Sequence, residues 1–149
     1  MEKIDSNIQK YENYKEQMGR LKKALHAEFY LEAIFIEFAI LEDRIESVLR
    51  HSNKFNPEKH NTLNKKLGRL KEMQRQKNGL VRRYFSDELF DEIYAWKDER
   101  NVLIHSLMNQ TLHKEDLKEL AERGQKIIKT VSSKASLYNS FLARHEGHS

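Results

Sequence analysis

Apolar side chains recur at steps of three or four residues along nearly the whole chain, and this spacing constrains the fold more than any other feature of the sequence. It places these side chains on one face of a helix, whereas a half-buried strand requires strict alternation. The chain has five glycines and a single proline, Pro57, among its 149 residues. So few turn residues exclude the many short strands of a β-sandwich or barrel, and the sequence predicts an all-α protein.

The apolar pattern divides into amphipathic segments joined by short connections. The expected helices are one that ends near Lys23 and others at about Ala27 to His51, Asn56 to Gly79, Ser86 to Asn109 and Lys114 to Arg144. Short connections favour antiparallel neighbours, and a chain of this length has room for one core only. We therefore expect a single domain over residues 1–149, folded as an antiparallel four- to five-helix bundle.

Specific residues mark three of the expected helix ends. Asn56-Pro57 predicts a helix start, with asparagine as the cap and proline at the first helical position. Asn78-Gly79 predicts the end of the same helix in a left-handed C-cap. Ser86, followed by two acidic residues, predicts the N-cap of the next helix.

Several classes of protein are excluded by what the sequence lacks. There is no cysteine, so the chain can form neither a disulfide nor a thiolate metal site. The longest apolar run, Ala33 to Leu41, is interrupted by Glu37 and is shorter than the ~20 residues of a membrane span. The sequence contains no E-x-x-H pair, no H-E-x-x-H and no phosphate-binding glycine loop. We expect a cytoplasmic protein with no membrane segment, no metal and no cofactor.

Positive charge is concentrated in one segment. Between Lys54 and Arg83 there are ten basic residues and two acidic ones, although the net charge of the whole chain is only +4. A general excess of lysine would be spread along the chain, so the clustering indicates an anionic partner. A solvated helix face is the alternative interpretation.

Two charged residues stand where the helical period requires an apolar side chain. Arg100 follows Trp96 at the step of a core stripe, and Glu37 lies between Ile34 and Leu41 on another. An ion that loses its buried partner costs about 3–5 kcal/mol, so these charges must pair, line a polar cavity or face a partner chain. We predict a Glu37–Arg100 salt bridge in which the carboxylate fixes the direction of the guanidinium.

The residues around Arg100 add chemistry to this position. Asn101 and His105 lie one turn apart on one helix face, and Asp98 lies a further turn back. The long side chain of Arg100 can approach the same face, which brings a phosphate-binding guanidinium, an amide and a titratable imidazole together. Asp98, like Glu37, is expected to support these groups rather than to act on a substrate.

This stretch, Arg100-Asn101-Val102-Leu103-Ile104-His105, resembles the arginine, polar residue, spacer and histidine signature of the HEPN superfamily of small helical domains. The resemblance implies a metal-independent endoribonuclease of the toxin or phage-defence type, with Arg100 and His105 as catalytic residues and Asn101 beside them. It also implies a homodimer with one motif from each copy, and an antitoxin or other regulatory protein as partner. In one HEPN subgroup a tyrosine two places after the histidine is modified by a partner enzyme, and this sequence has Leu107 there.

RNA is therefore the expected anionic partner of the basic segment. The residues expected to contact its backbone are Lys65, Lys66, Arg69, Lys71, Arg82 and Arg83. Tyr84 and Phe85 follow directly, as rings that either stack on an unpaired base or fill the core.

Two other functional interpretations remain open at this stage. The chain can be a non-catalytic module that binds RNA or a protein, or a purely structural dimer. His105 discriminates between them, because a nuclease needs this side chain exposed in a cleft.

Overall fold

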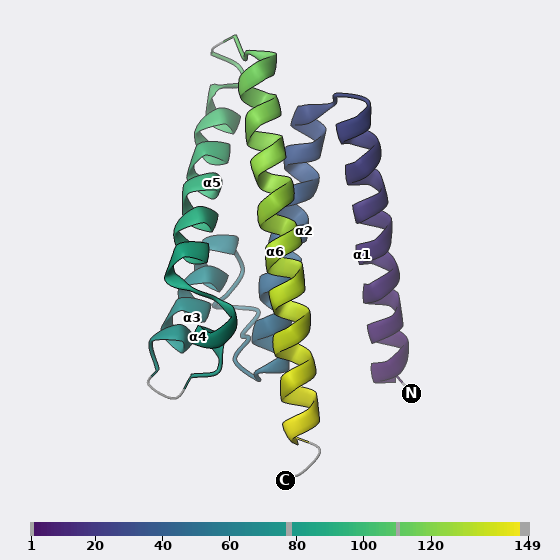
Figure 1. Ribbon diagram of the computed structural model, residues 1–149, viewed down its shortest axis with the longest axis vertical. Helices are drawn as coiled ribbons and strands as arrows, with labels where there is room; N and C mark the ends of the chain where they lie inside the picture. Colours follow the sequence, from purple (N-terminus) through teal and green to yellow (C-terminus); the bar gives the residue numbers. More distant parts are fainter. Residues whose placement is uncertain (1, 77–78, 110, 147–149) are drawn as a thin grey trace.

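The computed structural model describes residues 2–76, 79–109 and 111–146, and within these ranges the chain is helical with no strand (Figure 1). The helices are α1 (Glu2–His26), α2 (Tyr30–His51), α3 (Leu63–Arg75), α4 (Val81–Tyr84), α5 (Asp87–Ser106) and α6 (Lys114–Glu146). The pairs α1/α2 and α5/α6 run antiparallel (Figure 1). The all-α class and the helical bundle are thus confirmed, with the single turn of α4 added between α3 and α5.

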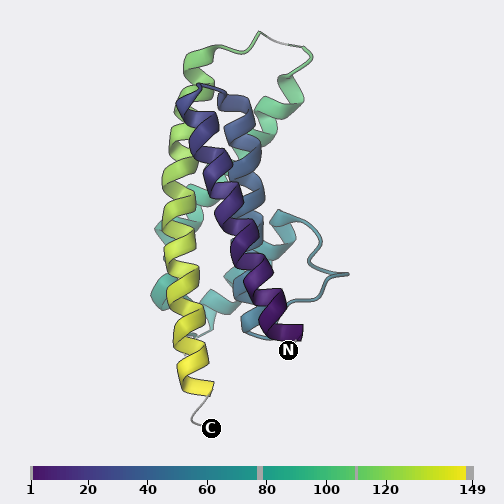
Figure 2. The ribbon, with the colours of Figure 1, turned by 90° about the vertical axis from the view of Figure 1, so that its right-hand side faces the viewer.

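Helix α2 is the centre of the bundle. It packs against α1 on one side, α6 along its length and α3 near its C-terminal end, while α5 packs mainly against α6. The 52–62 connection between α2 and α3 projects away from the helices (Figure 2). Helix α3 contacts the C-terminal half of α2, where Lys66 meets Glu42 and Glu46. Phe35 in the N-terminal half of α2 stays 43% exposed, and we call the side of α2 that bears it the open side.

The core is built from the apolar stripes of these helices. Trp96 of α5 is fully buried, and its Nε1 donates a hydrogen bond to the carbonyl oxygen of Leu120 in α6 at 2.9 Å. Gln74 of α3 is also buried, and its Nε2 donates to the carbonyl oxygen of Phe85 at 2.7 Å. These buried bonds fix α5 against α6 and α3 against the segment that follows α4.

The start of α3 differs from the prediction. The Asn56-Pro57 pair forms a turn instead of a helix start, in which the Asn56 side chain accepts from the backbone N–H of Glu58 at 3.0 Å. Helix α3 begins six residues later at Leu63, and Thr62 is its N-cap, accepting from the N–H of Lys65 at 3.2 Å. An asparagine followed by proline suits an Asx turn as well as a helix cap, which explains the error.

Other helix ends also differ from the sequence prediction. Helix α3 ends at Arg75, and no glycine among the described residues, Gly79 included, has a positive φ, so the predicted left-handed cap at Gly79 is wrong; Asn78 lies outside the described residues. Helix α5 ends at Ser106, three residues before the predicted end. The Ser86 cap of α5 is confirmed by its hydrogen bond from the N–H of Leu89 at 3.1 Å.

Left-handed residues do end two helices, but they are not glycines. Glu28 after α1 has φ 62° and Asn53 after α2 has φ 56°. In each case the next residue donates its N–H back to a carbonyl five positions earlier, at 2.8 Å for Phe29 and 2.9 Å for Lys54. This is the Schellman arrangement, and it carries α1 to His26, past the predicted end near Lys23.

No helix within the described part of the chain is both long enough and apolar enough to cross a membrane.

Candidate functional site

The C-terminal half of α5 carries the three residues predicted to be catalytic. Arg100 and Asn101 are held together, because the Arg100 Nη1 donates to the Asn101 Oδ1 at 3.1 Å. His105 lies one turn further along the helix and is exposed. No hydrogen bond joins the His105 ring to another side chain within the described ranges. The helix therefore places the three groups on one side but connects only two of them.

Aromatic rings of α2 hold the Arg100 guanidinium. Its Cζ lies 3.9 Å from the centroid of the Phe38 ring and 5.4 Å from that of Phe35. The Nε is buried without a hydrogen-bond partner, and burial lowers the pKa of this guanidinium. An arginine retains its charge under these conditions because its ordinary pKa is so high. Arg100 is thus a stacked cation at the open side of α2.

The predicted pairing of Glu37 with Arg100 is wrong. Glu37 is 0% exposed, and neither of its carboxylate oxygens has a hydrogen-bond partner among the described residues. Its carboxyl group faces Gly124 of α6, whereas the neighbouring residue Phe38 faces Arg100. One step along α2 turns the side chain by about 100°, so Glu37 and the ring that contacts Arg100 lie on different faces of α2. Desolvation raises the pKa of Glu37 to about 9, so the group is a neutral acid at pH 7.

Asp98 contacts Lys97, whereas it was expected to support Arg100, Asn101 and His105. Its Oδ1 accepts from the Lys97 Nζ at 2.9 Å, and its side chain is exposed. It lies at the border of a cavity of about 520 Å³ between the end of α5 and the start of α6, lined mainly by apolar groups such as Leu103 and Leu117. No sequence signal indicated this cavity. None of Arg100, Asn101 and His105 is among the residues that line it.

One member of the predicted RNA-binding set does not lie on an open cationic face. Lys66 is only 6% exposed, and its Nζ contacts the carboxylates of Glu42 at 2.7 Å and Glu46 at 3.2 Å. Burial alone would lower the pKa of Lys66, but the two carboxylates outweigh it and the pKa is raised. The two carboxylates compensate the charge of this lysine inside the α2–α3 contact. Lys66 is therefore excluded from the candidate surface.

The remaining basic residues of the set are accessible to different degrees. Lys65 and the pair Arg82 and Arg83 are exposed. Arg69 is half-buried and pairs with Glu72 at 2.9 Å, and Lys71 lies 5.4 Å from the centroid of the Tyr94 ring. We call these accessible residues of α3 and α4 the cationic strip, although Lys71 faces Tyr94 of α5 and not the side of α3 that bears Lys65 and Arg69. Lys97 lies between α3 and the Arg100 region, where its Nζ contacts Asn64 at 3.3 Å and Asp98 at 2.9 Å. It is only 8% exposed, so it adds no accessible charge to the strip.

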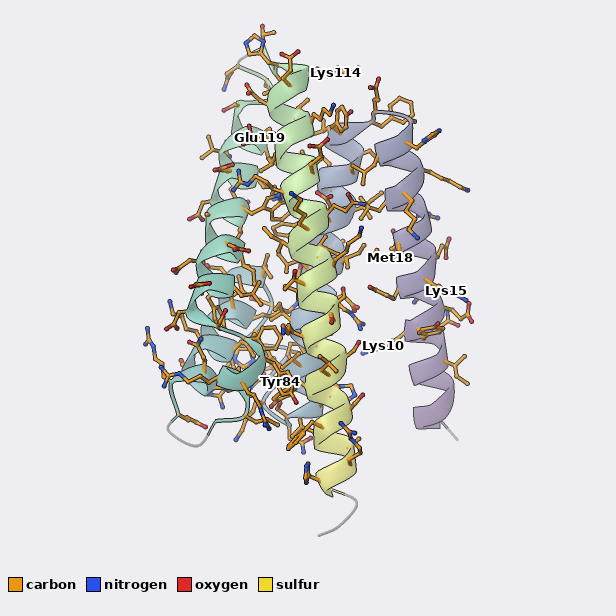
Figure 3. All side chains as sticks on the ribbon, viewed as in Figure 1. Lys10, Lys15, Met18, Tyr84, Lys114 and Glu119 are labelled. Carbon is orange, nitrogen blue, oxygen red and sulfur yellow. The ribbon has the colours of Figure 1, made fainter. Side chains whose placement is uncertain are left out.

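The two rings that follow the Arg82-Arg83 pair belong to the core side of the molecule. Phe85 is fully buried, and Tyr84 packs edge-on against Tyr138 of α6 at a centroid distance of 6.1 Å. Tyr84 points toward α6 in Figure 3. The structure therefore favours the core interpretation of both rings over base stacking.

Within the described part of the chain, no three or more histidine and carboxylate side chains lie close enough together to bind one metal ion.

Comparison of the chain with protein-family models, curated proteins and solved structures finds no match to any of the three. The α5 site and the motif that it carries are therefore the features of the chain that bear on its function.

Proposed function

We propose that the chain is an HEPN-like, metal-independent endoribonuclease of the toxin or phage-defence type, and that α5 carries its catalytic groups. The observation that carries the proposal is the hydrogen-bonded Arg100–Asn101 pair with an exposed His105 one turn away. A guanidinium already oriented by an amide offers a phosphate its free N–H groups. The cationic strip on α3 and α4 supplies further positive charge for an RNA backbone.

The reaction proposed is an internal transfer on the RNA phosphate. The ribose 2′-oxygen loses its proton to an imidazole and forms a bond to phosphorus, while the bond from phosphorus to the 5′-oxygen breaks. The leaving 5′-oxygen takes a proton from an imidazolium. Arg100 stabilises the negative charge on the non-bridging oxygens. The products are a 2′,3′-cyclic phosphate and a 5′-hydroxyl.

A homodimer is part of the proposal, because one imidazole cannot act as base and acid in the same step. Two copies related by a two-fold axis would bring two His105 rings to one phosphate. Exposed apolar side chains near the site support such contact: Phe35 is 43% exposed beside Arg100, and Val102 and Met108 are 66% and 93% exposed. These side chains are available for burial when two copies associate.

The deciding experiment uses purified protein, single-stranded RNA and an excess of EDTA. We expect cleavage to persist and the products to carry cyclic phosphate and 5′-hydroxyl ends, identified by mass spectrometry. Loss of cleavage in EDTA, or linear 3′-hydroxyl and 5′-phosphate ends, would refute the mechanism.

A non-catalytic RNA-binding module is the second candidate, favoured by one observation. The ring of His105 has no hydrogen-bond partner in the described part of the chain that would fix its orientation, whereas a general base is usually oriented by a third group. RNA that is bound and left intact by the dimer would establish this alternative.

A further inference from the structure

Two helices build the immediate surroundings of the Arg100 guanidinium. Helix α5 bears this residue but packs mainly against α6, so the side chain reaches α2 only by its own length. There it meets Phe35 and Phe38, two rings that lie three residues apart on one face of α2. The surroundings of this arginine therefore include residues that the motif on α5 does not contain.

The two rings differ in how firmly they are held. Phe38 is half-buried and packs against the hydrophobic core, and its centroid lies 3.9 Å from the Arg100 Cζ. Phe35 is 43% exposed, and its centroid lies 5.4 Å away. Carbon atoms are in van der Waals contact at about 3.5–4.0 Å, so only the nearer ring touches the guanidinium with its face. Phe38 is thus the fixed surface and Phe35 an outer neighbour.

The nitrogens of the guanidinium show what keeps the group in this position. Nη1 donates to the Asn101 Oδ1 at 3.1 Å. Nε is buried and has no hydrogen-bond partner in the described part of the chain. A buried N–H without a partner costs free energy, so another contact must compensate for it. The face of the Phe38 ring supplies that contact.

The acidic residues closest to Arg100 along the chain do not pair with it. Asp98 and Glu99 each form their salt bridge with another basic residue. Glu37 directly precedes Phe38, but its carboxyl group faces α6. Within the described residues Arg100 forms no salt bridge, so its positive charge is not compensated by a carboxylate.

From these contacts we infer that Phe38 is the positioning residue of Arg100, and that it orients the guanidinium without cancelling its charge. A carboxylate would also orient a guanidinium, but the ion pair would reduce the positive charge offered to a phosphate. An aromatic face attracts a cation through its quadrupole and carries no net charge. The effect of Phe38 on RNA cleavage rests on the proposed function, whereas its effect on the orientation of Arg100 does not.

The orientation is tested without RNA, by the NMR signals of the arginine side chains. The ring current of an aromatic face shifts protons above it upfield, so the Cδ and Nε protons of Arg100 should resonate upfield of their usual positions. Phe38→Leu removes the ring but keeps an apolar side chain, and should return these signals to the usual positions. The spectrum of Arg100→Lys identifies them. Unchanged Arg100 signals in Phe38→Leu overturn the inference, whether or not the protein cleaves RNA.

Phe55→Leu is the matched control, because Phe55 is another half-buried ring that lies against an arginine. The Arg50 Cζ lies 4.3 Å from its centroid, near the C-terminal end of α2. This variant should shift the signals of Arg50 and leave those of Arg100 in place. Equal shifts of Arg100 in both variants would show a general loosening of α2 and overturn the inference.

The kinetics of RNA cleavage test the consequence for the reaction. Phe38→Leu should lower kcat by ~10-fold or more with little change in KM, because a misplaced guanidinium stabilises the transition state less. Phe38→Tyr keeps the ring and should stay close to the wild type. In an Arg100→Lys background, Phe38→Leu should cause little further loss, since the ring acts through Arg100. The same fold-loss in both backgrounds would show a merely structural role and overturn the inference.

Failure of the proposed function gives a different result from failure of this inference. A wild type that leaves RNA intact refutes the nuclease, and a shift of the Arg100 signals in Phe38→Leu still supports the positioning by Phe38. Urea unfolding checks the fold of each variant. Phe38→Met provides the same test if Phe38→Leu does not fold, because methionine adapts to irregular core space and has no aromatic face.

Discussion

Arg100 and Glu37 both bring an ionisable group into apolar surroundings, and the protein accommodates them in different ways. Arg100 keeps its charge and stacks on Phe38, with Asn101 as its hydrogen-bond acceptor. Glu37 gives up its charge, because desolvation raises its pKa to about 9. The sequence identified both residues as exceptions to the apolar pattern. It could not show that neighbouring faces of α2 would separate them.

The state of Glu37 predicts how stability changes with pH. The pKa rises from 4.5 in the unfolded chain to about 9 in the folded protein. Below pH 4.5 both states are protonated and no penalty exists. Between these values only the unfolded chain ionises, so stability falls as pH rises, by on the order of 3 kcal/mol at pH 7.

Glu37→Gln removes this ionisation while it keeps the shape of the side chain. Urea unfolding should show the variant to be more stable than the wild type at pH 8 and similar at pH 4.5. A salt bridge to Arg100 would produce the opposite sign at pH 8. An unchanged dependence on pH would contradict the neutral state of Glu37.

Gly124 should be intolerant of a side chain. A Cβ at this position would clash with the Glu37 carboxylate and lie 2.8 Å from Trp96 Cζ2. Gly124→Ala should therefore destabilise the protein by about 1–3 kcal/mol in chemical denaturation, despite the better helix propensity of alanine. Gly68→Ala is the matched control, since nothing lies within 4 Å of its Cβ and it should stabilise α3 by about 0.5–1 kcal/mol. Equal effects would contradict the close packing at Gly124.

The proposed chemistry makes specific demands on α5. His105→Ala should reduce RNA cleavage by ~10²–10⁴-fold, as expected for a general acid–base group. Arg100→Lys should be impaired, because an ammonium cannot reproduce the bidentate contact or the stacking on Phe38. His113→Ala, in the connection after α5, serves as the control. Wild-type cleavage by a folded His105→Ala protein would refute the assignment.

At the scale of the elements, the apolar period predicted the helices well and their ends less well. The Ser86 cap was found where the sequence placed it. The left-handed residues Glu28 and Asn53 were missed because neither is a glycine, and Pro57 was assigned to a helix although it belongs to a turn. Periodicity reports which face is buried, whereas an end depends on a few backbone hydrogen bonds that several residue types can satisfy.

The outer face of α3 should contribute to RNA affinity through charge. Lys65→Gln with Arg69→Gln should weaken binding and flatten its dependence on salt, since each contact to a single-stranded phosphate adds ~0.7 to the logarithmic slope. Lys22→Gln with Lys23→Gln on α1 removes the same charge at exposed positions outside the strip. Fluorescence anisotropy at several salt concentrations measures both slopes. If the two double variants gave the same slope, α3 would be a solvated face only.

At the scale of the whole molecule, the sequence predicted a bundle but not which surfaces it would leave open. Amphipathic faces show that helices pack, and they do not specify that α3 stops short of the N-terminal part of α2. That arrangement exposes Phe35 and creates the open side on which Arg100 lies. The sequence showed the basic segment. Only the structure shows that the carboxylates of Glu42 and Glu46 compensate the charge of Lys66.

Association of two copies through the C-terminal half of α5 should be visible in solution. We expect light scattering at micromolar concentration to give twice the 17.8 kDa of the chain. Val102→Glu places a charge on the exposed apolar surface of α5 and should shift the protein toward monomer. Leu137→Glu, at an exposed position of α6 far along the chain, should remain dimeric. A monomeric wild type, with or without RNA, would rule out the two-histidine site.

The central place of α2 has a consequence for how the bundle opens. Helix α1 rests mainly on α2, while α2 is enclosed by α1, α3 and α6. Release of α1 therefore disrupts mainly its contact with α2, whereas exposure of α2 requires α1, α3 and α6 to separate from it. In deuterated solvent, the amides of α1 should exchange first and those in the middle of α2 last. The order of exchange would thus trace the hierarchy of contacts, with α2 reporting the global unfolding of the protein.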